Sequence, residues 1–224
     1  VANGSVDSHS FELLMGNHIH LNNKSKTLLA YEEFKKTKLI STPKILSFVI
    51  SVQNNFRELQ NVWSSTSAYR WKQSVTACIQ ACTRIGMKHL NDNALEILRW
   101  GADIYFAFQR KEEMITKSSV SKDTEENTRE GREMKEKVIS EKLHDNNTNI
   151  SSDSSGANYI NAVTDMINCL CHNRIREAPL AQKMLKTMKQ PPPQCYGSLI
   201  DCFLTSGEYD LADKIVTELL EEHL

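Results

Sequence analysis

The chain has 224 residues, and its 27 Lys and Arg against 28 Asp and Glu give a formal net charge of -1. This length fits one extended domain or two small ones, and the balanced charge provides no overall attraction for nucleic acid or an anionic membrane, so any RNA contact must be local. Hydrophobic residues make up 40% and aromatic residues 7% of the chain, which favours helices and makes an all-β fold a poor match.

The N-terminal part of the chain carries apolar residues at helical spacing. Residues 11–16 and 27–34 predict a degenerate pair of helices, and residues 43–63 predict further amphipathic helix. A helix that starts near Tyr69 and ends near Gly86 is followed, after a short turn, by a second helix that opens with residues 93–100. We therefore expect helical hairpins throughout residues 1–111.

Residues 112–158 differ in composition from both flanks. Lys, Glu, Asp, Ser, Thr and Asn dominate this stretch, and no aromatic residue occurs between Phe108 and Tyr159. Such a segment buries too little apolar surface to offset the entropy of ordering it, so we expect a charged, mostly disordered insertion. Residues 132–143 could form a transient helix within it.

Residues 159–224 predict two further helical hairpins. In the last hairpin, apolar residues recur at helical spacing on both sides of Gly207, which permits a left-handed turn, and Asp210 is placed to charge the start of the second helix. The preceding hairpin repeats this plan at a spacing of 33 or 34 residues, with Pro179 in the first turn of its second helix. The matched positions are Met166, Ile167, Leu170, Cys171 and Ala178 with Leu199, Ile200, Phe203, Leu204 and Ala212.

Residues 199–219 (LIDCFLTSGEYDLADKIVTEL) resemble the pentatricopeptide repeat, a relative of the tetratricopeptide repeat, and residues 166–179 and 78–86 are similar but poorer matches. The resemblance implies an all-α, α-solenoid-like stack of antiparallel helical hairpins. Pentatricopeptide proteins bind single-stranded RNA, one base per repeat. Here the base-reading positions fall on Gly197 and on the pair Thr164 and Pro192, and neither Gly197 nor Pro192 offers a polar side chain. The resemblance therefore implies the fold more firmly than base reading.

A basic and aromatic group near the third hairpin is the candidate RNA-binding surface. Its cations could neutralise phosphates while its aromatic rings stack on bases. The alternative is that the rings anchor a helix while the cations lie in solvent. The candidate residues are Tyr69, Arg70, Trp71, Lys72, Thr76, Arg84 and Lys88.

The remaining motifs bear on cofactors, catalysis and compartment. Six cysteines lie within apolar helical patterns and lack zinc-site spacing, so we expect buried, reduced thiols in the cytoplasm and no metal or other cofactor. The longest apolar run, residues 45–52, is far shorter than the roughly 20 residues that cross a bilayer, so no membrane contact is expected. Glycine-rich phosphate loops and hydrolase motifs are missing, which argues against an enzyme or a small-molecule substrate. The sequence predicts a non-catalytic module that binds a protein partner within a protein of RNA metabolism; the alternative is direct binding of single-stranded RNA.

Overall fold

The computed structural model describes residues 7–66, 71–90, 93–120 and 152–222, and every regular element in these ranges is an α-helix. The all-α prediction is therefore confirmed for the described residues. The ten helices found there are α1 (Ser8–His20), α2 (Lys24–Lys36), α3 (Pro43–Ser51), α4 (Phe56–Ser65), α5 (Lys72–Lys88), α6 (Ala94–Val120), α8 (Ser152–Leu170), α9 (Ala178–Thr187), α10 (Pro193–Ser206) and α11 (Tyr209–Glu222).

Local sequence signals begin and end several of these helices. Asp7, Asn23, Thr42 and Asn55 precede α1 to α4, and the side chain of each accepts a hydrogen bond from a backbone N–H of the first helical turn. At the other end of the chain, Gly207 terminates α10 with a φ of 77°, in the left-handed region that favours glycine. The turn predicted at this glycine is present.

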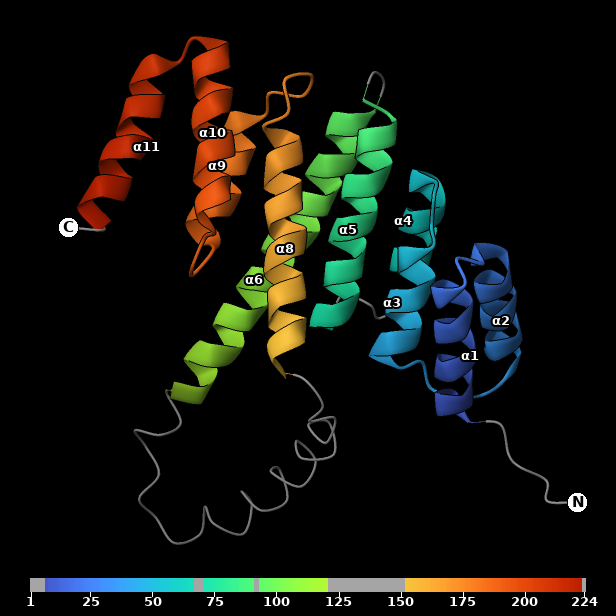
Figure 1. Cartoon of the computed structure of the whole chain (residues 1–224). Helices are drawn as coiled ribbons and strands as arrows, with labels where there is room; N and C mark the ends of the chain where they lie inside the picture. Colours follow the sequence, from blue (N-terminus) through green and yellow to red (C-terminus); the bar gives the residue numbers. More distant parts are fainter. Residues whose placement is uncertain (1–6, 67–70, 91–92, 121–151, 223–224) are drawn as a thin grey trace, which may run out of the picture.

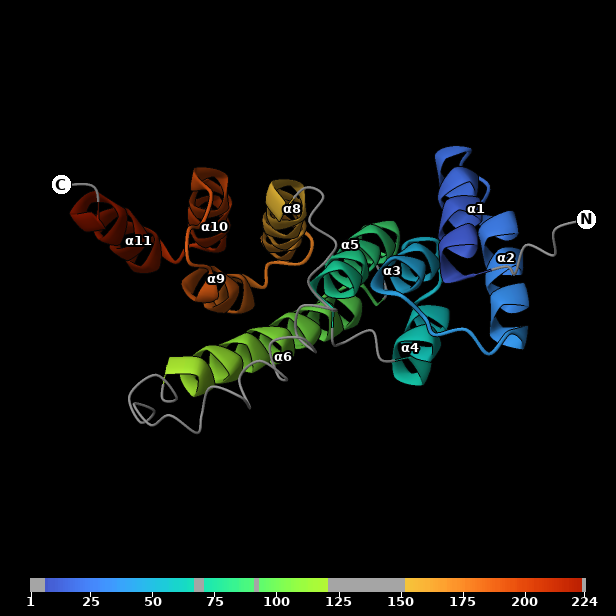
Figure 2. The ribbon, with the colours of Figure 1, turned by 90° about the horizontal axis from the view of Figure 1, so that it is seen from below.

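The helices form two rows that run the length of the molecule (Figures 1 and 2). One row contains α1, α3, α5, α8 and α10, and each of these helices contacts the next one in the row. The helices α2, α4, α6 and α9 lie along one side of this row, and α11 packs on α10 at the C-terminal end (Figure 2). Helices α5 and α8 are therefore neighbours although residues 89–151 separate them in the sequence.

The hydrophobic core extends across that junction. One cluster of buried side chains runs from α3 to α11 and includes Tyr105 and Phe108 before the 121–151 segment, and Tyr159, Met166 and Phe203 after it. A smaller cluster joins α1, α2 and α3. Residues on both sides of the predicted insertion, from α3 to α11, thus contribute to one continuous core.

The described helices extend into both ends of the predicted insertion, residues 112–158. Helix α6 continues to Val120 and α8 begins at Ser152, so both ends of the expected disordered stretch are helical. Composition favours the first part of the α6 extension, since residues 112–114 (EEM) are all good helix formers. The remainder, residues 121–151, lies outside the described residues, as does the transient helix expected at residues 132–143.

Candidate ligand-binding pocket

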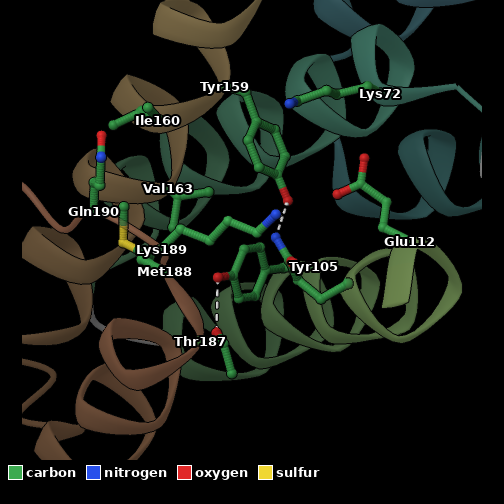
Figure 3. Close-up of a pocket in the computed structure, with 11 residues that line it drawn as sticks. Lys72, Tyr105, Glu112, Tyr159, Ile160, Val163, Thr187, Met188, Lys189 and Gln190 are labelled. Atoms are coloured by element: carbon green, nitrogen blue, oxygen red, sulfur yellow. Dashed lines mark hydrogen bonds between the residues drawn. The ribbon is translucent and has the colours of Figure 1, made fainter. Parts of the chain in front are cut away.

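A pocket of about 380 Å³ opens where α5, α6, α8 and the segment after α9 meet (Figure 3). Four separate parts of the chain build it, and its walls combine aromatic, aliphatic and charged side chains. The lining residues are Lys72 from α5, Tyr105, Gln109 and Glu112 from α6, Tyr159, Ile160 and Val163 from α8, and Thr187, Met188, Lys189 and Gln190.

Tyr105 joins α6 to the C-terminal end of α9. Its side chain is fully buried, and its hydroxyl shares a 2.7 Å hydrogen bond with the hydroxyl of Thr187 (Figure 3). Burial raises the pKa of the Tyr105 phenol, so the hydroxyl stays neutral at physiological pH. This contact fixes the wall of the pocket that α9 provides.

Tyr159 forms the adjoining wall and lies under a cation. The Gln109 amide Nε2 donates a 3.0 Å hydrogen bond to its hydroxyl, and Lys72 Nζ lies 4.8 Å from the centre of its ring. That distance is within the range of a cation–π interaction. Burial is the main cause that raises the pKa of Tyr159, so this ring also remains neutral. Tyr159 and Tyr105 stack with their ring centroids 6.3 Å apart.

The stacked rings of Tyr105 and Tyr159, here called the aromatic floor, are surrounded by the charged side chains of the pocket. Lys189 extends across the pocket, and Glu112 lies on the same side as Lys72 (Figure 3). Two ammonium groups against one carboxylate make the lining net positive. The arrangement suits a ligand group with an apolar body and an acidic tip, because the exposed Ile160 side chain offers an apolar contact while the lysines attract the tip.

Of the seven predicted RNA-contact residues, one lines this pocket. Tyr69 and Arg70 lie outside the described residues, whereas Lys72 borders the pocket and Trp71 is partly buried against the core. Thr76 is buried, and its hydroxyl donates to the Lys72 carbonyl at 2.8 Å. Because Thr76 is buried and its hydroxyl bonds within its own helix, it is not available to a ligand.

Arg84 and Lys88 lie at the opposite end of α5 from Lys72. Lys88 follows Lys72 by 16 positions, which is about 24 Å at the α-helical rise per residue. Arg84 is half-buried and donates through Nη2 to the carbonyls of Ser51 at 2.8 Å and Gln53 at 2.6 Å. The two parts of the predicted basic and aromatic surface therefore lie one helix length apart, and RNA binding by these residues stays a prediction.

Thr164, the residue that would correspond to a pentatricopeptide base reader, also faces the interior. It is buried, and its hydroxyl donates to the Ile160 carbonyl at 2.9 Å. The position on α10 that would serve the same purpose is Gly197, which has open space around it. Neither position presents a polar side chain to a base.

The cysteines are free thiols, and five of the six are buried while Cys169 is partly exposed. Burial raises the pKa of Cys169 to about 11 and raises that of Cys171 further. Among the described residues, His, Cys, Asp and Glu nowhere gather in a group of three that could hold a metal ion. No helix in the described part of the chain has the length and hydrophobicity needed to cross a bilayer.

Most pocket residues carried no sequence signal. The contact between Tyr105 and Thr187 joins positions 82 residues apart, and that between Gln109 and Tyr159 joins positions 50 residues apart. The loss of aromatic residues after Phe108 and their return at Tyr159 marked the edges of the insertion. It gave no indication that these edges meet.

No protein-family model matches this chain, and a comparison with curated proteins gave no match.

Proposed function

We propose that the chain is a non-catalytic interaction module, an α-solenoid-like stack of antiparallel helical hairpins that binds a segment of a protein partner. The two rows of helices and the contacts along the first row support this interpretation (Figure 2). Helical-repeat stacks offer extended surfaces on which a peptide or a partner helix can lie.

The observation that carries the proposal is the pocket between α5, α6 and α8. A buried aromatic floor with a charged rim is the form that receives an anchoring side chain in protein interfaces. The aromatic pair Tyr105 and Tyr159 supplies the floor, and Lys72 and Lys189 supply the charge. A partner segment that places an aromatic or long acidic side chain in the pocket would match the aromatic floor and the positive charge.

The cellular setting follows from two weaker lines of support. The resemblance of residues 199–219 to the pentatricopeptide repeat favours a role within a protein of RNA metabolism. The free and mostly buried thiols favour a reducing compartment such as the cytoplasm.

Direct binding of single-stranded RNA is the second candidate function. Its support is the presence of Lys72 and Lys189 in the pocket lining, since their ammonium groups could contact phosphates. Such binding should weaken steeply with salt.

A matched pair of substitutions tests the pocket. Ile160 and Leu211 are 37% and 38% exposed, and only Ile160 lines the pocket. Ile160→Trp would fill the pocket, whereas Leu211→Trp adds the same side chain on α11. A photoreactive amino acid at Gln190 in the full chain would identify the cross-linked partner segment, whose affinity for both variants would then be measured with purified components.

We expect Ile160→Trp to weaken binding of that segment about tenfold or more and Leu211→Trp to leave it unchanged. Equal affinities for the two variants would contradict a role for the pocket. Cross-linking to RNA, with affinity that falls steeply as salt increases, would replace the protein-binding proposal with the second candidate.

A further inference from the structure

A group of cations lies near the turn between α3 and α4, on the side of the molecule where α5 ends at Lys88. Lys24 Nζ donates a 3.0 Å hydrogen bond to Asn54 Oδ1. Arg84 Nη2 donates to the carbonyl of Gln53, the preceding residue, at 2.6 Å. Two cations from α2 and α5 therefore meet at adjacent residues of one turn.

Lys88 adds a third positive charge. It follows Arg84 by four residues on α5, so the two side chains lie on the same face of the helix, and Lys88 is exposed. The effect of these charges is visible at Lys24, whose pKa is lowered first by desolvation and then by repulsion from Arg84 and Lys88. The two charged side chains that perturb Lys24 are both cations.

The cation group adjoins a second cavity, of about 220 Å³. Asn54 belongs to both, because it accepts the Lys24 hydrogen bond and lines the cavity. The other polar side chains in the cavity lining are those of Asn55, His89 and Asn93. Amide and imidazole groups thus lie beside concentrated positive charge, which is a combination that binds a compact anion.

We propose that Lys24, Lys88 and Arg84, together with Asn54, form a binding site for a single phosphate group carried by a phosphorylated peptide. Arg84 contributes its charge and position, since its Nη2 is occupied by the carbonyls of Ser51 and Gln53. Lys24 and Lys88 provide the ammonium groups that contact the phosphate oxygens, and the Asn54 amide provides a further donor.

The compactness of the site favours a phosphorylated peptide over RNA. An RNA strand repeats its charge at every nucleotide and needs a track of cations along the surface. Here Lys24 and Arg84 bind adjacent residues of one turn and Lys88 lies one helical turn from Arg84, whereas Lys72 of the first pocket lies at the other end of α5. A phosphomonoester concentrates nearly two negative charges on three oxygens, which matches a compact group.

The test uses the full chain and nuclear magnetic resonance titration. The probes are inorganic phosphate, a short Gly- and Ser-rich peptide with one phosphoserine, the same peptide without phosphate, and oligouridine. We expect saturable shifts at Asn54, His89 and Lys24 with the phosphate and the phosphopeptide only, and an increase in the Lys24 pKa when the phosphopeptide binds.

Two double variants with the same loss of charge separate the site from general electrostatics. Lys24→Ala with Lys88→Ala should weaken phosphopeptide binding about tenfold or more. Lys38→Ala with Lys44→Ala removes two exposed lysines outside the site and should leave binding unchanged. Equal losses in both variants, or shifts at Asn54 that do not saturate, would overturn the proposal. Tighter binding of oligouridine than of the phosphopeptide through Lys24 and Lys88 would overturn it too. The variants leave the first pocket intact, so a failure here is distinct from a failure of the proposed function.

Discussion

Gly101 and Gly197 are both helical glycines, but their surroundings are opposite. A Cβ at Gly101 would lie 2.5 Å from Met166 Cε and 2.9 Å from Cys82 Cβ, because α5, α6 and α8 meet there. A Cβ at Gly197 would have no neighbour within 4 Å. Gly101 therefore permits the close approach of three helices, whereas Gly197 contributes only backbone flexibility.

This contrast gives the first prediction. Gly101→Ala should lower the free energy of unfolding by about 1–3 kcal/mol. The flexible Met166 methyl group can move away from the new methyl group, but Cys82 Cβ is attached directly to the backbone and cannot. Gly197→Ala should raise the free energy of unfolding by up to about 1 kcal/mol through the loss of unfolded-state entropy. Urea denaturation of both variants measures the difference. Equal effects of the two substitutions would contradict the packing at Gly101.

The thiols give a prediction on reactivity. Cys169 is the partly exposed cysteine, and its pKa of about 11 leaves little reactive thiolate at neutral pH. We expect Cys169 to react first with a disulfide reagent, slowly at neutral pH and faster as the pH approaches 11. Mass spectrometry of the modified chain identifies the site. Rapid modification of several cysteines at neutral pH would show that their surroundings are more open.

Two buried thiols, those of Cys78 and Cys171, make the stability of the fold depend on pH. Burial raises the pKa values of Cys78 and Cys171 in the folded chain above the usual value near 8.5. In the window above that value the unfolded state loses protons that the folded state retains, so the free energy of unfolding should fall as pH rises. Denaturant titrations from neutral to alkaline pH test this, and Cys171→Ala should reduce the slope. A flat profile in that range would contradict the assignment.

At the scale of helices, the turn between α10 and α11 depends on one residue. Gly207 has a φ of 77°, its N–H donates to the Leu204 carbonyl at 3.2 Å, and the N–H of Glu208 donates to the Phe203 carbonyl at 2.9 Å. These bonds complete the C-terminal end of α10 and direct the chain into α11.

Gly207→Ala should therefore destabilise this end of the molecule by about 1–2 kcal/mol, because an alanine side chain is strained in the left-handed region. Gly207→Asn should cost less, since asparagine tolerates that conformation. Hydrogen exchange of the α11 amides follows the effect locally. Unchanged protection in the alanine variant would mean that packing of α11 on α10, and not the turn, determines its stability.

The sequence predicted helices well where periodicity and turn residues agree. Pro179 lies in the first turn of α9, Gly207 ends α10 and Asp210 lies in the first turn of α11, all as expected. The sequence did not predict the break within residues 43–63, where α3 ends at Ser51 and α4 begins at Phe56. Asn55 is the N-cap of α4, and its side chain accepts a 2.8 Å hydrogen bond from the Arg57 N–H. Within an apolar periodic stretch, an asparagine indicates a helix boundary less strongly than a proline or a glycine does.

At the scale of the whole molecule, the candidate pocket could not be derived from the sequence. It exists because α8 packs on α5, which brings Lys72 to Tyr159 and encloses Tyr105 between helices far apart in the chain. Composition alone suggested a charged insertion within the helical stack. The residues that join the helices on its two sides are ordinary core residues such as Cys82 and Met166, and their partners are set by three-dimensional packing.

The pocket therefore depends on the contact between α5 and α8, and cleavage of the chain tests whether that contact holds. A specific protease site placed within residues 121–151 would cut the full chain into two pieces without changing any described residue. We predict that the pieces stay together as one species in size-exclusion chromatography, because the core cluster from α3 to α11 spans the cut. The cleaved protein should also keep the slow reactivity of its buried cysteines. Separation of the two pieces under native conditions would contradict a continuous core and, with it, the pocket.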